Sequence, residues 1–406
     1  MGYDVAAIRA QFPTLERKIY GNKPLIFLDS AASAQKPRAV TAAMTDFMDT
    51  TYSNVHRGIH ALSQEATDAF EAVRGKVAGF MNADEREVVF TKNTTEGINL
   101  VAQSWGRKNL SPGDEILVTE LEHHANIVPW QLIAEATGAK VRAVAVLDDG
   151  ALDMDDFHAK LGPSTKMVAV AYVSNVRGTV LPVEDIIKAA HAQGALVLLD
   201  ASQAVTHRRV DVKALDVDFL VWTGHKLYGP TGIGVLFGKY DLLDAMPPFL
   251  GGGDMIDTVS FQGTTFREPP YRFEAGTPAI VETIGLGAAI DWVETVGIEA
   301  IAAHEADLLD YAMDQLAAAN DVTVFGTTPT KVSVLAFLLG DHHAHDVGTI
   351  LDRTGVALRV GQHCAEPLHM RLGVHSTVRA SFAAYNSRAD VDGLLDGLSV
   401  CRELLG

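Results

Sequence analysis

The segment VEDIIKAAHAQGALVLLDASQAV, residues 183–205, places a helical pattern directly before a short apolar run that ends in an acid. Residues 183–194 predict a helix that ends at Gly194, because a helix C-cap favours glycine. Residues 195–200 predict a strand, and the apolar residues before Asp200 are typical of a strand buried on both faces. A helix that leads into a buried strand is the repeating unit of a parallel sheet, so this segment decides the fold class.

Further runs of the same kind lie on both sides of this segment and are again separated by helical patterns. They occupy residues 86–91, 114–120, 139–146, 166–174, 218–223 and 233–238. Buried strands that alternate with helices favour an α/β fold with a mostly parallel, seven-stranded sheet.

The pattern changes after about residue 288. A long helical stretch at 304–319 precedes two apolar runs, a further helix and strand, and a terminal helix from about residue 388. We therefore predict two domains with a soft boundary. The large α/β domain covers residues 21–288, and a smaller α+β domain is formed by residues 1–20 and 289–406.

Composition excludes several classes of partner. Of the 406 residues, 51 are Asp or Glu and 33 are Lys or Arg, and the net charge of −18 disfavours nucleic acid and anionic membrane surfaces. No apolar run approaches the roughly 18 residues of a membrane span, and the first residues lack the layout of a signal peptide. Two cysteines form no disulfide framework, which favours a reducing compartment. We expect a cytoplasmic enzyme.

Polar residues follow several of the predicted strands, at the sheet edge where α/β proteins bind ligands. Asn93 and Glu96 resemble a capping box that leaves Thr94 and Thr95 in the first turn of a helix. Free N–H groups and two hydroxyls there suit a phosphate, although the threonines can also simply cap the helix. Asp200 needs a cation or several donors if it is enclosed, unless it serves as a helix N-cap.

Lys226 lies in TGHKLYGPTGIGVLFG, residues 223–238, between a strand and a Gly/Pro-rich turn. A lysine in a confined site can lose its proton and form a Schiff base with an aldehyde. Thr223 and His225 flank it with groups that can hold phosphate oxygens. The glycines here do not follow the G-x-G-x-x-G spacing of a dinucleotide site.

One cofactor accounts for these parts together. Pyridoxal phosphate needs a lysine for its aldehyde, an acid for its ring nitrogen and a phosphate site at a helix N-terminus. Lys226, Asp200 and the Thr94–Thr95 pair fill these roles in that order. No metal site is predicted, because His123 and His124 are adjacent and point to different faces, without a carboxylate at metal spacing.

Several long motifs give the chain a clear resemblance along essentially its whole length. They are LDSAASAQKP (28–37), HRGIHALS (56–63), TTEGINLVAQSWG (94–106), EHHANIVPW (122–130), TGHKLYGPTGIG (223–234), RFEAGTP (272–278) and RVGQHCAEPL (359–368). In these segments the chain resembles the group II cysteine desulfurases of the SufS type, which are fold-type I pyridoxal-phosphate enzymes of the class V aminotransferase family. The resemblance implies a homodimer that takes sulfur from L-cysteine and passes it to an acceptor protein of SufE or SufU type for iron–sulfur cluster assembly.

The resemblance also implies a role for each matching residue. Lys226 would bind the cofactor aldehyde and move protons, and His123 would stack on the cofactor ring and act as acid and base. Asp200 would pair with the ring nitrogen, and Gln203 would donate to the phenolic oxygen. The phosphate would be held by Thr95, Thr223 and His225, with Thr94 close by and Thr277 reaching across from a second subunit. The substrate carboxylate would be bound by Arg379, in a pocket that is lined by His56, Asn175 and Arg359.

Cys364 would accept the sulfur of L-cysteine as a persulfide, which leaves L-alanine. A nucleophilic thiolate needs a lowered pKa, and we expect His363 and Arg359 to supply the positive charge. Cys401 lies in a terminal amphipathic helix, where packing is the expected role.

Two departures and two alternatives remain. Gln362 stands where the family commonly has histidine, and Arg177 stands where leucine is usual. The same scaffold serves selenocysteine lyases, which release selenide and L-alanine. The cluster DHHAHD, residues 341–346, could bind a metal or contact a zinc-bearing acceptor, although such loops are usually solvated.

Overall fold

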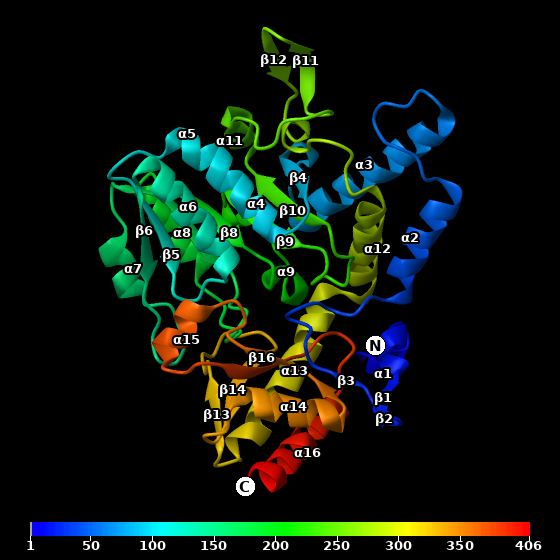
Figure 1. The fold of residues 1–406 in the computed structure, drawn as a ribbon, viewed down its shortest axis with the longest axis vertical. Helices are drawn as coiled ribbons and strands as arrows, with labels where there is room; N and C mark the ends of the chain where they lie inside the picture. The colour runs from blue at the N-terminus through cyan, green and yellow to red at the C-terminus, as the bar shows by residue number, and fades with distance from the viewer. Residues whose placement is uncertain (1) are drawn as a thin grey trace.

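A mostly parallel sheet of seven strands forms the centre of the larger part of the molecule (Figure 1). The computed structural model describes residues 2–406. The strand order is β4-β10-β9-β8-β7-β5-β6, and β10 is antiparallel to both of its neighbours. The bounds are β4 (Val88–Thr91), β5 (Glu115–Thr119), β6 (Lys140–Val144), β7 (Thr165–Ala171), β8 (Leu196–Asp200), β9 (Phe219–Thr223) and β10 (Gly234–Gly238). The predicted α/β fold and its seven-stranded sheet are confirmed.

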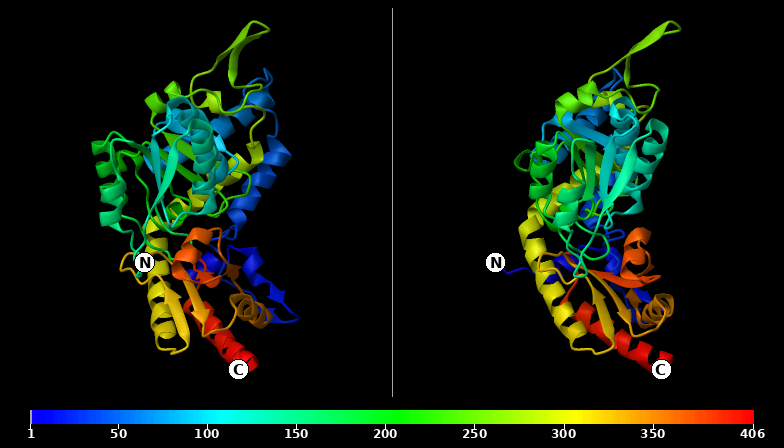
Figure 2. Two further views of the ribbon diagram at one scale, coloured as in Figure 1. Left: turned by 60° about the vertical axis from the view of Figure 1, so that its left-hand side comes forward. Right: turned by 90° about the vertical axis from the view of Figure 1, so that its left-hand side faces the viewer.

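The strands are apolar because helices cover both faces of the sheet (Figure 2). In β8, Val197 and Leu199 pack into one buried cluster, whereas Leu198 packs into the other. This alternation is the period-two pattern of a strand with two buried faces. The main covering helices are α3 (Ala61–Met81), α4 (Thr94–Val101), α6 (Val128–Thr137), α8 (Val183–Ala192), α9 (Ala204–His207) and α12 (Ile280–Val296).

A second, antiparallel sheet lies below the first in the view of Figure 1 and has its own buried core. Its strands, in the order β13-β14-β17-β16, are β13 (Val322–Phe325), β14 (Val334–Leu339), β17 (Thr377–Ser381) and β16 (Arg359–Gly361). The helices of this part are α13 (Ile298–Ala317), α14 (Ala344–Thr354), α15 (Glu366–Leu372) and α16 (Arg388–Leu405). The predicted helix at 304–319 is therefore longer, because α13 follows α12 directly at Gly297, whose φ is +90°.

The N-terminal segment joins this second part of the molecule. Strand β3 (Ile26–Phe27) pairs in parallel with β15 (Val356–Ala357), and Leu28 lies in the second core. Helix α1 (Val5–Arg9) is tied to the C-terminal region by the Arg9–Asp390 ion pair of 3.1 Å. The other elements are β1 (Lys18–Ile19), β2 (Lys23–Pro24), α2 (Arg38–Thr50), α5 (Arg107–Asn109), α7 (Met154–Lys160), α10 (Val212–Leu215) and α11 (Tyr240–Ala245).

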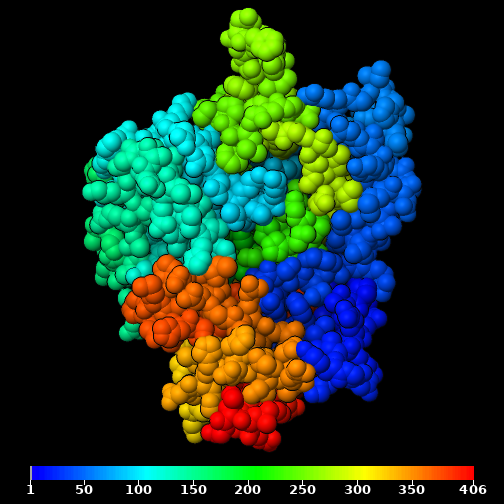
Figure 3. All heavy atoms as spheres, viewed as in Figure 1, coloured from blue at the N-terminus to red at the C-terminus, as the bar shows by residue number. Residues whose placement is uncertain are grey.

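A two-stranded hairpin, β11 (Ile256–Ser260) and β12 (Gly263–Phe266), projects away from the larger part of the molecule (Figures 1 and 3). Its tip residue Phe261 is fully exposed, and Val259 is 65% exposed. Apolar side chains displayed in this way are typical of a surface that contacts another protein chain. Among residues 2–406, no helix is long and apolar enough to cross a membrane.

Candidate active site

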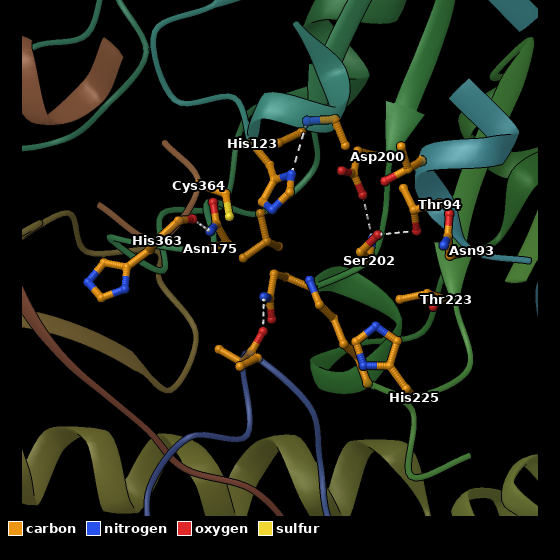
Figure 4. A pocket seen from close by; sticks show the side chains of 18 of the residues that line it. Asn93, Thr94, His123, Asn175, Asp200, Ser202, Thr223, His225, His363 and Cys364 are labelled. Carbon is orange, nitrogen blue, oxygen red and sulfur yellow. Dashed lines mark hydrogen bonds between the residues drawn. The ribbon is translucent and has the colours of Figure 1, made fainter. Parts of the chain in front are cut away.

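A cavity of about 230 Å³ opens at the carboxyl ends of β5, β7, β8 and β9, where the second sheet meets the first. Nearly all of the predicted site residues line it, although they come from distant parts of the chain (Figure 4). These residues are Thr94, Thr95, His123, Asn175, Asp200, Gln203, Thr223, His225, Lys226, Arg359, Cys364 and Arg379. The first nine lie at or after the carboxyl ends of strands in the first sheet. Arg359 and Arg379 lie on β16 and β17 of the second sheet, and Cys364 lies in the loop that follows β16.

One end of the cavity has the groups of a phosphate site. Thr94 begins α4, and its Oγ1 lies 2.7 Å from Oγ of Ser202. Oγ1 of Thr223 is buried and has no hydrogen-bond partner within residues 2–406. A buried hydroxyl without a partner is costly unless a bound group satisfies it. Unsatisfied N–H groups at the N-terminus of α4 and these hydroxyls fit a phosphate.

The predicted capping box at α4 is only half formed. The Asn93 side chain accepts a hydrogen bond of 2.9 Å from the backbone N–H of Glu96, as predicted. The Glu96 carboxylate reaches past Asn93 and accepts from the backbone N–H of Lys92, at 2.5 Å. The backbone of Asn93 is extended, with φ −174°.

Asp200 ends β8 at the floor of the cavity and is only 8% exposed. Its Oδ1 accepts a hydrogen bond of 2.9 Å from the backbone N–H of Ser202, and this contact fixes the carboxylate (Figure 4). The Gln203 side chain donates to the carbonyl of Ala31 at 2.9 Å, so the N-terminal segment forms part of the wall. A fixed, enclosed carboxylate fits the protonated ring nitrogen of pyridoxal phosphate.

Lys226 and His123 have perturbed pKa values. Burial lowers the pKa of Lys226 to about 8, against the opposing effect of the nearby Asp200 carboxylate. Burial and then the positive charge of Lys226 lower the pKa of His123 to about 4, so its ring is neutral near pH 7. Nδ1 of His123 accepts from the backbone N–H of Ala125 at 3.1 Å, which leaves the ring proton on Nε2. The cavity therefore holds an amine that can lose its proton and a neutral imidazole that can donate a hydrogen bond.

Arg379 lies on β17 and is 2% exposed. Its guanidinium donates to the carbonyl of Asn175 at 2.9 Å and to Oδ1 of Asp29 at 3.2 Å. Nε of Arg379 is buried without a partner in the described part of the chain. A buried arginine in a cavity with an unused donor fits a carboxylate ligand.

Cys364 is exposed, and the loop that carries it is held in an unusual conformation. His363 and Cys364 have φ values of +51° and +56°, a left-handed conformation that costs of order 1–3 kcal/mol for each non-glycine residue. Three hydrogen bonds anchor this loop to the larger part of the molecule. They are Asn175 Nδ2 to the His363 carbonyl (2.8 Å), His124 N–H to the Cys364 carbonyl (2.7 Å) and Glu366 N–H to His124 Nε2 (3.0 Å).

The expectation that His363 supplies positive charge to Cys364 is wrong. Burial, followed by the charge of Arg379, lowers the pKa of His363 to about 2, so this imidazole is neutral. Its ring points away from the centre of the cavity (Figure 4). Of the two cations predicted beside the thiol, Arg359 alone remains, and it also lines the cavity.

His56 and Thr277 do not line the cavity of this chain. Nε2 of His56 lies 2.7 Å from Oε1 of Glu71, and Thr277 is exposed on the surface. His56 lines a separate small pocket together with Gly276 and Pro278, the two neighbours of Thr277. The prediction that His56 lines the pocket therefore fails for a single chain, because the path of the loop at 51–60 carries it elsewhere.

The sequence patterns did not reveal Ser202 and Glu122. Ser202 contacts both Thr94 and Asp200, and its position two residues after Asp200 is a signal for a side-chain-capped turn. Glu122 is fully buried beside His123, and burial raises its pKa to about 7. No pattern distinguished this glutamate, because its partners Thr119, Asn126 and the backbone N–H of Ala171 come from three elements.

Acid is expected to destabilise the protein through the enclosed histidines. Burial lowers the pKa of His225 to about 4, whereas an unfolded histidine titrates near 6.5. Between these pH values the unfolded chain binds more protons, so the free energy of unfolding falls as the pH drops. The contribution of His225 to the free energy of unfolding is about 3 kcal/mol, which is present above pH 6.5 and is lost towards pH 4.

Urea unfolding at pH 7 and at pH 5 measures how steeply the free energy of unfolding depends on pH. His225→Asn should flatten this dependence, and an unchanged slope would contradict the assignment.

The chain has full-length relatives and structural neighbours. Residues 26–394 match the family described as Aminotransferase class-V. A cysteine desulfurase of Enterobacter sp. (strain 638) is 52% identical over 408 residues, which cover 100% of both chains. The crystal structure of the cysteine desulfurase CsdA (S-sulfonic acid) from Escherichia coli matches with a TM-score of 0.92 and 42% identity, over 100% of both chains. A mutant of C-DES with glycine covalently linked to its PLP cofactor matches with a TM-score of 0.80 and 25% identity, over 96% of this chain and 98% of that chain.

Proposed function

Because the chain belongs to the aminotransferase class-V family, we propose that the cavity is the active site of a pyridoxal-phosphate-dependent cysteine desulfurase. The enzyme converts L-cysteine to L-alanine and takes up the sulfur as a persulfide on Cys364. The predicted resemblance to fold-type I cysteine desulfurases is confirmed by the full-length matches, and the SufS subgroup stays a prediction. The observation that carries the proposal is an exposed thiol beside an enclosed lysine–aspartate pair in one cavity.

The residues of the cavity fit pyridoxal phosphate. Thr94, Thr95, Thr223 and His225 would hold its phosphate, together with Ser202, which the sequence did not suggest. Asp200 would keep its ring nitrogen protonated, Gln203 would donate to its phenolic oxygen and His123 would stack on its ring. When bound, the cofactor withdraws electrons from the substrate carbons and so weakens the C–H and C–S bonds of L-cysteine.

Lys226 and His123 would act on the substrate in different ways. With a pKa of about 8, the amine of Lys226 changes protonation state easily near neutral pH, which suits a group that takes a proton from a substrate carbon and returns it. His123 keeps its proton on Nε2, because Nδ1 is occupied by the backbone N–H of Ala125. Its neutral ring can therefore donate a hydrogen bond at Nε2 without carrying a charge into the cavity.

Arg379 would orient the substrate through its carboxylate. The contacts to Asp29 and to the Asn175 carbonyl hold the guanidinium in place, and Nε remains available for a ligand. Asn175 also holds the His363 carbonyl, so the residue that fixes Arg379 fixes the Cys364 loop as well. Through these two contacts, Asn175 would fix the position of the substrate relative to the thiol that receives its sulfur.

The sulfur transfer balances without an external oxidant. The thiolate of Cys364 attacks the substrate sulfur, an S–S bond forms, and the C–S bond breaks with its electron pair kept on carbon. That carbon then takes up a proton, and the product is L-alanine. Cys364 is left as a persulfide, and it is exposed where a second protein can reach it.

An acceptor protein of SufE or SufU type would remove this sulfur for iron–sulfur cluster assembly in the cytoplasm. A homodimer is also part of the proposal. Thr277 would complete the phosphate site of the second subunit, and His56 beside it would accompany it there. The exposed hairpin β11–β12 lies in the same region of the chain and offers apolar surface for such an assembly.

Product analysis tests the proposed function. The enzyme loaded with pyridoxal phosphate is expected to release one L-alanine for each sulfur that appears as persulfide or, with reductant present, as sulfide. Alanine and sulfur are quantified in parallel with L-cysteine and with L-selenocysteine as substrates. Release of pyruvate and ammonia in place of alanine would contradict the desulfurase assignment. Alanine from selenocysteine alone would make the chain a selenocysteine lyase.

A further inference from the structure

The two neighbours of Cys364 are joined to each other by a buried chain of hydrogen bonds. Nε2 of His363 lies 2.9 Å from Oγ1 of Thr377, and the same oxygen lies 3.1 Å from Nε2 of His369. Nδ1 of His369 lies 3.0 Å from the carbonyl oxygen of Ala365. The three side chains are 5%, 0% and 1% exposed for His363, Thr377 and His369. We call this series the His363–Thr377–His369 relay.

The chemistry of the groups gives the relay a single direction. A carbonyl oxygen only accepts, so Nδ1 of His369 carries the proton that it donates to Ala365. Burial lowers the pKa of His369, and the neutral ring therefore has a lone pair at Nε2, which accepts from the hydroxyl of Thr377. The oxygen of Thr377 then accepts from Nε2–H of His363.

This direction also settles the tautomer of His363. With its proton on Nε2, the neutral ring has a lone pair at Nδ1, and that atom is buried without a partner within residues 2–406. Asn175 and His124 hold the loop through backbone groups, namely the carbonyls of His363 and Cys364 and the N–H of Glu366. The relay is the contact that fixes the His363 side chain, and it reaches the other side of Cys364 at Ala365.

The backbone around Cys364 needs such a constraint. Two successive non-glycine residues with positive φ are unfavourable and persist only where the surroundings impose them. The relay spans from the loop to α15 and to β17, so it ties both flanks of Cys364 to regular structure. Without it, the loop can relax to conformations that aim the thiol differently.

We propose that Thr377 and His369 are positioning residues that act through His363 to hold Cys364 in the conformation that receives sulfur. The proposal deepens the proposed function and rests on Cys364 as the sulfur acceptor. Neither residue touches the substrate, because neither lines the cavity. Their effect is therefore on the transfer step and on the reactivity of the thiol, with substrate binding left intact.

Replacement of Thr377 by valine, which has nearly the same shape, removes both contacts of the hydroxyl. In the loaded enzyme we expect kcat for alanine release to fall about tenfold and KM to stay within about twofold, the scale of two lost buried hydrogen bonds. Thr377→Ser keeps the hydroxyl and should restore kcat. His369→Leu removes the links to Thr377 and to Ala365 but keeps the contact between His363 and Thr377, so it should cost less, about threefold. The exposed His375, six residues further along, provides the matched control in His375→Leu, which should behave as wild type.

A double variant and a thiol probe complete the test. If the residues act in series, Thr377→Val with His369→Leu should be no slower than Thr377→Val alone. The rate at which iodoacetamide alkylates Cys364 should rank the variants in the same order as kcat does. This measurement does not require turnover.

An unchanged kcat and alkylation rate in Thr377→Val, no rescue by Thr377→Ser, or additive effects in the double variant would overturn the proposal. If Thr377→Val fails to fold, as judged by its melting temperature, the comparison of His369→Leu with His375→Leu decides between the two outcomes. Wild-type protein that releases no alanine would refute the proposed function, while the alkylation order would still decide the relay.

Discussion

Release of L-alanine from L-cysteine is expected to fall by at least about 1000-fold when Cys364 is replaced by alanine, because this residue is the proposed nucleophile itself. No other described side chain lining the cavity carries a thiol, and the remaining cysteine, Cys401, is buried in α16. L-Cysteine should still bind, since Lys226, Asp200 and Arg379 are untouched. The variant should therefore show the cysteine-dependent change in cofactor absorbance without forming product.

Alanine production in a single turnover, with reductant present, measures this loss. Cys401→Ala is the matched control, and it should keep full activity with a somewhat lower melting temperature, because it removes only a packed side chain. Equal alanine release by the wild type and by Cys364→Ala would show that the thiol is a bystander. If the variant loses turnover with L-cysteine but keeps it with L-selenocysteine, Cys364 is needed to remove sulfur and is not needed to remove selenium.

The second large effect is expected at Lys226. Lys226→Ala should lower turnover by at least about 1000-fold, because the change removes the group proposed both to bind the cofactor covalently and to move protons. The side chain is enclosed and its pKa is lowered to about 8, and no other lysine lines the cavity in the described part of the chain. Arginine at this position should not restore activity, since a guanidinium stays protonated.

Two measurements separate the roles of Lys226. Borohydride reduction should attach pyridoxal phosphate covalently to the wild type and leave Lys226→Ala unlabelled, as read from protein mass. Lys92→Ala is the control, because Lys92 is exposed close to the N-terminus of α4 and lies outside the cavity. Labelling of another lysine with full activity in Lys226→Ala would remove Lys226 from the mechanism.

The sheet was predictable because its strands are buried on both faces. Such strands must be apolar throughout, and short apolar runs between helical patterns leave few alternatives. The hairpin β11–β12 was not predicted, because its residues are exposed and its apolar residues do not alternate with polar ones at the period of two that marks a strand. The start of α13 was also missed, because α12 and α13 meet at Gly297 without a connecting loop.

Some residues of the candidate site were likewise predictable from the sequence, and others were not. Thr94 and Lys226 follow strands of one sheet and Asp200 ends another strand of that sheet, and the shared direction of these strands predicts that their carboxyl ends lie at one edge. The contact of Arg379 with Asp29 joins positions 350 residues apart, and no local sequence pattern predicts such a contact. The neutral state of His363 was equally hidden, because burial depends on tertiary packing and the sequence shows only a histidine beside a cysteine.

The pairing of β3 with β15 and the contact of Asp29 with Arg379 join segments that are synthesised early and late. A ribosome that adds about 5–20 residues per second needs roughly 20–70 s to cover the interval between Asp29 and Arg379. Within that interval the strands that precede Asp200 and Lys226 emerge well before the segment with Cys364. A nascent chain that ends before Cys364 therefore contains the residues proposed to hold the cofactor but lacks the proposed sulfur acceptor, and Asp29 meets Arg379 only after β17 has been made.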